Sequence, residues 1–156
     1  MELIRGIHNL RPRHRGCVAT IGNYDGVHLG HQAVLDSIIE VGTQLGLPSA
    51  VMAFEPTPQE FFAGQRAPAR LTRFREKYNA LAGTGVDRFL CLRFDRAFSE
   101  LSPDAFVERI LVQGLGVRHL VAGDDFRYGF KRSGDFTSLK AAGRKHGFSV
   151  QDMPSF

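Results

Sequence analysis

Apolar runs alternate with helical patterns along most of the chain. Short apolar runs predict the strands of a buried sheet, at residues 17–22, 49–54, 88–94, 118–122 and 148–152. Amphipathic stretches between them predict helices at residues 29–45, 72–82, 102–112 and 135–147. Strands separated by helices indicate an α/β fold, in which a mainly parallel sheet is covered by helices on both faces.

Capping residues mark several ends of the predicted helices. Gly46 follows the helix of residues 29–45, as expected of a glycine just past a helix end. Ser102 and Pro103 form an N-cap and N1 pair, and Asp135 is a further N-cap residue. These signals support the helix positions that the hydrophobic pattern predicts.

Three unusual loops follow three of the predicted strands, at residues 22–31, 55–62 and 123–134. The carboxyl ends of parallel strands meet at one edge of a sheet, and ligands bind there where the strand order reverses. We therefore expect the three loops to build one ligand site.

The composition is typical of one domain with a substantial core, since 43% of the 156 residues are hydrophobic. We expect no membrane association, because no apolar run approaches the ~20 residues of a membrane span and the first residues lack the apolar core of a signal peptide. Cys17 and Cys91 fall in predicted strands without C-x-x-C spacing. They are expected to be buried free thiols, typical of a cytoplasmic protein, and not zinc ligands.

The formal net charge of +4 permits an anionic partner without specifying one. One arginine cluster, Arg66, Arg70, Arg73 and Arg75, is interleaved with a single aromatic residue, Phe74. One aromatic residue is too few for a base-stacking platform, and such clusters are typical of solvated faces. We therefore expect no nucleic-acid partner.

The first loop carries two histidines, His28 and His31, between a strand and a helix. A strand, a tight turn and a helix N-terminus form an anion site, because the backbone N–H groups and the helix dipole favour negative charge. Gly22, Gly26 and Gly30 leave room for close backbone approach. Metal ligation and plain capping are the alternatives, and metal ligation lacks a third ligand at a matching spacing. Phosphate contact is the favoured interpretation.

Four stretches together resemble a known family. Residues 22–31, G-N-Y-D-G-V-H-L-G-H, resemble the HxGH motif of the nucleotidylyltransferase superfamily, in the form found in prokaryotic FAD synthetases. Residues 54–58 (F-E-P-T-P), 70–77 (R-L-T then E-K) and 123–129 (G-D-D-F-R-Y-G) resemble further motifs of the same family. Tyr24 stands where the family usually has phenylalanine.

The resemblance implies a Rossmann-like nucleotidylyltransferase fold and an FMN adenylyltransferase. Such an enzyme converts ATP and FMN to FAD and pyrophosphate, with Mg²⁺ accompanying ATP and no metal held by the protein alone. His28 and His31 would donate hydrogen bonds to the triphosphate and to the transition state. The residues implied in ATP binding are Gly22, Asn23, Tyr24, Asp25 and Gly30.

The resemblance also implies flavin contacts, at Pro56 and at aromatic positions. Phe61 and Phe62 cannot both face inward if their segment is a regular strand, and Phe126 and Tyr128 alternate similarly. One member of each pair is a candidate for stacking on the isoalloxazine ring, and the resemblance selects Phe62 and Tyr128.

The loop of residues 123–134 contains acidic and basic side chains, and each group has either a structural role or a role in ligand binding. Asp124 and Asp125 form either a polar turn or, at Asp125, a hydrogen-bond acceptor for the edge of the flavin ring. Arg127, Lys131 and Arg132 form either a solvated loop or a contact with a phosphate of FMN or ATP. We predict that Asp125 binds flavin and that Arg127 contacts phosphate.

The resemblance sets two further expectations about the extent of the chain. Residues 1–156 are expected to form the adenylyltransferase domain without the family's later Ser/Thr-rich triphosphate-binding segment and without its riboflavin kinase domain. Two alternatives remain open. One is a related nucleotidylyltransferase with a different acceptor, and the other is a non-catalytic module that binds nucleotide or flavin.

Overall fold

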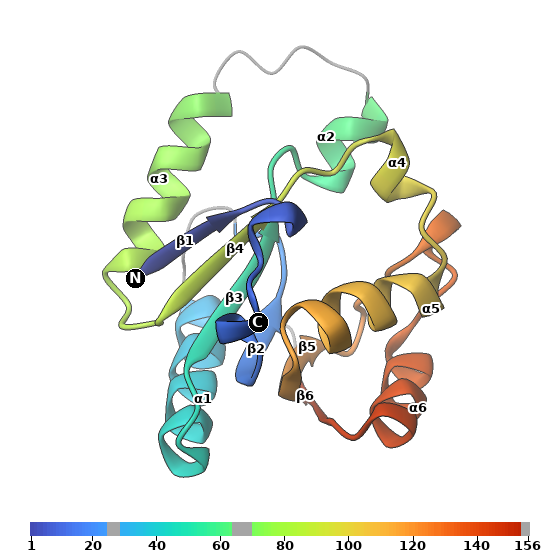
Figure 1. Ribbon diagram of the computed structural model, residues 1–156. Helices are drawn as coiled ribbons and strands as arrows, with labels where there is room; N and C mark the ends of the chain where they lie inside the picture. Colours follow the sequence, from blue (N-terminus) through green and yellow to red (C-terminus); the bar gives the residue numbers. More distant parts are fainter. Residues whose placement is uncertain (25–28, 64–69, 154–156) are drawn as a thin grey trace.

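The computed structural model describes residues 1–24, 29–63 and 70–153, and these residues contain one six-stranded sheet (Figure 1). The strand order is β1-β4-β3-β2-β5-β6, and each neighbouring pair is parallel. From β2 the chain first adds strands on one side and then on the other, so the order reverses between β2 and β5. The strands are β1 (Glu2–Arg5), β2 (Cys17–Ile21), β3 (Ser49–Phe54), β4 (Arg88–Leu92), β5 (Val117–Gly123) and β6 (Ser149–Met153).

Helices connect the strands. The last turn of α5 continues directly into a π-helical stretch (Val107–Gly114), and short 3₁₀ turns lie at Ile7–Asn9, Pro12–His14 and Phe130–Arg132. In the described part of the chain, no helix has both the length and the apolar content needed to cross a membrane. The helices are α1 (Leu29–Leu45), α2 (Pro58–Ala63), α3 (Arg70–Ala82), α4 (Arg96–Ser99), α5 (Pro103–Phe106) and α6 (Phe136–His146).

Helices cover both faces of the sheet, because successive strand residues point to opposite sides. On one face Val51 of β3 packs with Leu35 of α1 and Leu81 of α3. On the other face Met52 packs with Ile110 of the π-helical stretch and with residues of α5 and α6. All of these side chains are fully buried. The predicted α/β fold with a parallel sheet and two covered faces is confirmed.

Most predicted elements are present, and several have the predicted bounds. Helix α1 and strand β3 begin and end where the pattern placed them. Asp135 caps α6 through a bond from Ser138 N, and Gly147 ends the helix with a left-handed φ of 87°. Strand β4 is shorter than predicted, since it ends at Leu92 and leaves Phe94 in the following loop.

Among the strands and α-helices of the described residues, three were not predicted, namely β1, α2 and α4. Strand β1 is a four-residue edge strand with one buried side chain, Ile4, and is too short for a periodic signal. The segment expected to be a loop or strand at 59–62 is helical. Thr57 and Glu60 explain why, because Thr57 Oγ1 accepts from Glu60 N at 3.2 Å while Glu60 Oε1 accepts from Thr57 N at 3.0 Å. This reciprocal capping box starts α2.

Candidate active site

A cavity of about 570 Å³ lies at the carboxyl edge of the sheet, beside the reversal of strand order. Its floor includes Ile21 and Gly22 at the end of β2 and Phe54 at the end of β3. Its walls come from α2, from the segment after β4 and from residues 125–132 after β5. Loops far apart in the sequence therefore do meet at one place, as the parallel arrangement requires.

Phenylalanine side chains form one wall of the cavity, which we call the phenylalanine wall (Phe54, Phe62, Phe94 and Phe98). The rings of Phe54 and Phe94 meet edge to face, with centroids 5.7 Å apart and an interplanar angle of 88°. Phe62 extends the wall from α2, with its ring 5.7 Å from that of Phe94, and is 67% exposed. A large exposed aromatic ring at a cavity mouth offers a surface for a flat ligand.

The opposite wall contains Phe126 and Tyr128, whose rings stack at 5.5 Å with an interplanar angle of 12°. Tyr128 is buried, and its hydroxyl is 2.9 Å from Ser138 Oγ at the start of α6. Burial raises the pKa of the Tyr128 hydroxyl, so this group stays protonated at neutral pH. The Tyr128 ring is therefore held at a fixed place beside the cavity.

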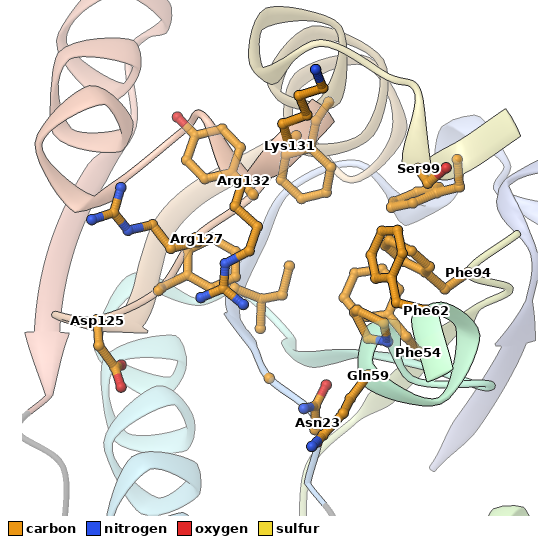
Figure 2. Close-up of a pocket in the computed structure, with 18 residues that line it drawn as sticks. Asn23, Phe54, Gln59, Phe62, Phe94, Ser99, Asp125, Arg127, Lys131 and Arg132 are labelled. Carbon is orange, nitrogen blue, oxygen red and sulfur yellow. The ribbon is translucent and has the colours of Figure 1, made fainter. Parts of the chain in front are cut away.

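Basic side chains stand across the cavity from the phenylalanine wall (Figure 2). In this view the guanidinium of Arg132 lies between Arg127 and the phenylalanine side chains, whereas the ammonium of Lys131 points away. Lys131 Nζ instead lies 5.4 Å from the centroid of the Phe130 ring. Among the described residues, neither arginine forms an ion pair. Hydrogen bonding from Ser138, and to a smaller extent the nearby charge of Arg127, lowers the pKa of the Asp135 carboxyl, so the Arg127 charge already has an acidic neighbour. Arg132 is therefore the cation better placed for an anionic ligand in the cavity.

The loop that carries these cations is tightly fixed. Phe130 N donates to Leu101 O at 2.7 Å, and Gly129 adopts a φ of 79° where a Cβ atom would meet the ring of Pro103 at 2.7 Å. Lys131 and Arg132 both adopt left-handed φ values, near 55°. Such conformations are costly for residues other than glycine, and they recur at functional sites.

Asp125 and Asn23 add polar groups to the cavity lining. Asp125 is exposed, and its Oδ1 lies 2.9 Å from the position that a Cβ atom on Gly123 would take. Asn23 follows directly after the floor residue Gly22 and is exposed (Figure 2). Asp124 is exposed and lies outside the lining. Of the two neighbouring carboxylates, Asp125 is therefore the one in the cavity lining, and its role in binding a ligand stays a prediction.

Tyr24 and His31 lie beside the cavity and contact each other. The ring centroids are 4.6 Å apart at an interplanar angle of 43°. The Tyr24 hydroxyl is 2.9 Å from Thr20 Oγ1 in β2, and burial raises its pKa to about 12. His31 stands in the first turn of α1 and is half-buried.

The structure brings together six of the predicted site residues in the cavity lining. Two others take different places, since Tyr24 is buried in the core and Pro56 is buried outside the lining, which instead contains Pro58. His31 and Gly30 lie at the start of α1, while His28 and Asp25 fall outside the described residues. The six are Gly22, Asn23, Phe62, Asp125, Arg127 and Tyr128.

The segment after β4 also contributes to the cavity, which the sequence pattern did not predict. Phe94 and Phe98 line the cavity, together with Ser99. A signal was present, because Phe94 lies at the carboxyl end of a predicted strand, where parallel sheets bind ligands. Phe98 gave no such signal, since its position depends on α4, whose N-cap Asp95 accepts from Phe98 N at 2.8 Å.

The described residues contain no group of three or more His, Cys, Asp or Glu side chains that could hold a metal ion. Near the cavity, the carboxylate that faces the lining is that of Asp125. One carboxylate matches the habit of Mg²⁺, which binds through one or two carboxylates together with substrate phosphates and not in a protein cage.

The reversal of strand order, with a cavity at its carboxyl edge, defines a Rossmann-like α/β fold, a class of fold in which ligands bind at this edge. A family model described as FAD synthetase matches residues 10–156. The chain belongs to the FAD synthetase family, as its motifs indicated.

Curated relatives agree with this assignment. The chain is 57% identical over 151 residues to the bifunctional riboflavin kinase/FMN adenylyltransferase of Pseudomonas fluorescens, covering 97% of this chain and 48% of that protein. It is 52% identical to the protein of the same description from Escherichia coli K12, and the match covers 100% of this chain and 50% of that protein. The chain thus spans about half the length of these relatives.

The structure of a protein described as a macrolide-efflux protein from Streptococcus pneumoniae superposes with a TM-score of 0.79. It is 22% identical, and the match covers 99% of this chain and 51% of that chain. A likeness at this identity shows the fold.

Proposed function

We propose that this chain is an FMN adenylyltransferase, which transfers the adenylyl group of ATP to FMN and releases pyrophosphate. The observation that carries the proposal is the cavity itself, in which the guanidinium of Arg132 lies across from the phenylalanine wall. FMN has the matching chemistry, since it joins a flat apolar ring system to a phosphate. The family assignment supports the same pair of substrates.

The isoalloxazine ring is placed between Phe62 and the stacked pair of Phe126 and Tyr128. Aromatic rings in offset or edge-to-face contact contribute about 0.5–1.5 kcal/mol beyond their buried area. Asp125, on the same loop as Tyr128, would accept a hydrogen bond from the ring edge. Arg132, with Arg127 behind it, would hold the FMN phosphate.

ATP is placed at the start of α1. Gly22 and Asn23 lead from β2 toward this helix, whose N-terminus favours a polyphosphate. His31 in its first turn, together with His28, would donate hydrogen bonds to the triphosphate. The proposed reaction occurs in the cytoplasm, and the buried free thiols of Cys17 and Cys91 agree with a reducing compartment.

The chemistry needs no covalent intermediate on the protein. A phosphate oxygen of FMN attacks the α-phosphorus of ATP, a P–O bond forms, and the bond to the β-phosphate oxygen breaks to release pyrophosphate. Catalysis then consists of positioning the two substrates and stabilising the developing charge. Mg²⁺, bound with the phosphates of ATP, would supply charge neutralisation on the leaving pyrophosphate.

The test is to incubate this chain with ATP, Mg²⁺ and FMN and to measure FAD by chromatography. The expected result is FAD in equal amount to pyrophosphate. Parallel reactions replace FMN with nicotinate mononucleotide, pantetheine phosphate or glycerol phosphate, and turnover of one of these in place of FMN would establish a different acceptor. Binding of FMN without FAD formation would instead indicate a flavin-binding module.

A further inference from the structure

Tyr24 joins the central strand of the sheet to His31. Its hydroxyl is hydrogen-bonded to Thr20 Oγ1 at 2.9 Å, and its ring lies against the His31 imidazole with centroids 4.6 Å apart. Thr20 belongs to β2 and is 1% exposed, so the anchor at this end is part of the core. His31 belongs to the first turn of α1. The Tyr24 side chain thus connects the sheet to the imidazole of His31, the proposed catalytic group.

The place of the Tyr24 ring is determined from several directions. The residue is 3% exposed and packs in the core between the sheet and α1. Its Cε2 atom lies 3.0 Å from the position that a Cβ atom on Gly22 would take, so the ring covers that glycine closely. The backbone of Tyr24 adopts a φ of 54°, a left-handed conformation that is costly for a bulky residue unless its surroundings enforce it.

From this geometry we infer that Tyr24 is a positioning residue: the Thr20–Tyr24 hydrogen bond holds the ring as a wall that fixes the orientation of the His31 imidazole. The inference rests on the proposed role of His31 in adenylyl transfer. Tyr24 itself does not line the cavity, so it acts through His31 and not on the substrates.

The physical consequence is a restriction of imidazole rotation. A histidine side chain exchanges between staggered rotamers, and a neighbouring ring excludes those that would overlap with it. A donor that is misplaced by about 1 Å loses on the order of 10²-fold in rate, because transition-state hydrogen bonds depend strongly on geometry. Holding His31 against a fixed ring avoids that loss before substrate binds.

Three variants separate the parts of this arrangement. Tyr24→Phe removes the hydroxyl and keeps the ring, while Thr20→Val removes the partner at nearly the same volume. Tyr24→Leu removes the ring and keeps an apolar side chain in the core. Tyr78→Phe is the matched control, because Tyr78 packs against the same core cluster from α3.

Two measurements are made on each variant. The first is the steady-state rate of FAD formation, resolved into kcat and the KM for FMN. The second is the NMR spectrum of the His31 ring protons, assigned with His31→Asn, since the current of a neighbouring aromatic ring shifts these signals. Thermal unfolding shows that each variant is folded.

We expect kcat to fall about 5-fold in Tyr24→Phe and in Thr20→Val, as for loss of one net hydrogen bond. In Tyr24→Leu we expect a fall of about 100-fold. The KM for FMN should stay within about 2-fold, and the double variant Tyr24→Phe/Thr20→Val should be no worse than either single variant, because both remove one bond. The His31 signals should move in all three variants and stay in place in Tyr78→Phe.

Unchanged His31 signals in folded Tyr24→Leu would overturn the inference, whether or not the chain forms FAD. An equal fall of kcat in Tyr78→Phe would also overturn it, since the effect would then be general loss of core packing. If the unaltered chain forms no FAD, the proposed function fails, while the His31 signals in Tyr24→Phe, which keeps the ring and removes the hydrogen bond to Thr20, still decide whether this anchored ring orients His31.

Discussion

At the level of single residues, Gly134 and Gly22 each lie so close to a tyrosine ring that a side chain at either position would crowd that ring. A Cβ atom on Gly134 would lie 2.6 Å from Cζ of Tyr128, and one on Gly22 would lie 3.0 Å from Cε2 of Tyr24. The sequence analysis expected Gly22 to allow close backbone approach of a phosphate. The structure adds a second reason, which is that a larger residue would displace the ring that contacts His31.

His31→Ala should lower kcat for FAD formation by about 10²–10³-fold, as when one transition-state donor is lost. The fold should persist, because His31 is half-buried at the start of a helix. His119→Ala is the control, since that histidine bonds to Ser149 and Gln151 on the edge strand β6. Initial rates and thermal unfolding check both. A His31→Ala chain with unaltered kcat would remove His31 from the mechanism.

Arg132→Gln should weaken FMN binding about 10-fold and leave riboflavin binding unchanged, because riboflavin lacks the phosphate that the guanidinium would hold. Quenching of flavin fluorescence measures both affinities. Arg144→Gln is the matched control, because it removes the same charge at an exposed position in the last turn of α6. Equal weakening of FMN and riboflavin by Arg132→Gln would argue for general damage to the loop.

At the scale of elements, a buried ion pair ties α3 to the loop between β3 and α2. Lys77 Nζ donates to Glu55 Oε2 at 3.0 Å, with 2% and 5% of the two side chains exposed. Glu55 Oε1 is buried and has no hydrogen-bond partner among the residues that the structure describes. The pair holds the loop at the point from which α2 carries Phe62 to the cavity.

Lys77→Met should lower the free energy of unfolding by about 3–5 kcal/mol, because it leaves the Glu55 carboxylate buried without its partner. Urea denaturation measures this change. The double variant Lys77→Met/Glu55→Gln should recover much of the loss, since removing both charges also removes the desolvation cost. A single variant as stable as the unaltered chain would mean that Glu55 reaches water when Lys77 is removed.

At the scale of the whole molecule, the edge strand β1 is fastened to the sheet by charge. Glu2 accepts hydrogen bonds from Arg13 and from His14 Nε2, the latter at 3.1 Å, and lies 3.7 Å from Arg88 of β4. His14 is buried, and its Nδ1 accepts from Arg11 N at 2.9 Å, so its proton is on Nε2. The hydrogen bond from Arg13, and then that from His14, lowers the pKa of Glu2 from 4.5 to about 2.

The pH dependence follows from that shift. A carboxyl whose pKa is lower in the folded state stabilises the fold above its unfolded pKa, and the contribution is lost as the pH falls from about 4.5 to about 2. Glu2→Gln should therefore lower the Tm at pH 7. The difference in Tm between this variant and the unaltered chain should shrink as the pH falls toward 2. Thermal unfolding across this range checks the prediction, and a Tm difference that is constant with pH would contradict it.

Most of the secondary structure, the parallel sheet and the family could be predicted from the sequence. Strands buried on both faces must be apolar throughout, and capping residues such as Asp135 act on their own helix, so both signals are local. The convergence of three loops also followed, because parallel strands place their carboxyl ends together. Strand β1 was missed, since a short edge strand buries too little to leave a pattern.

The contacts between side chains of different elements could not be predicted from the sequence and depend on the folded arrangement. It placed Phe94 and Phe98 in the cavity wall, paired Glu55 with Lys77, and set Tyr24 against His31. These contacts depend on the packing of α1, α3 and α4 against the sheet, which local periodicity does not specify. In the hydrophobic pattern a buried tyrosine cannot be distinguished from other apolar residues. Its contacts are set by the packing of the helices against the core.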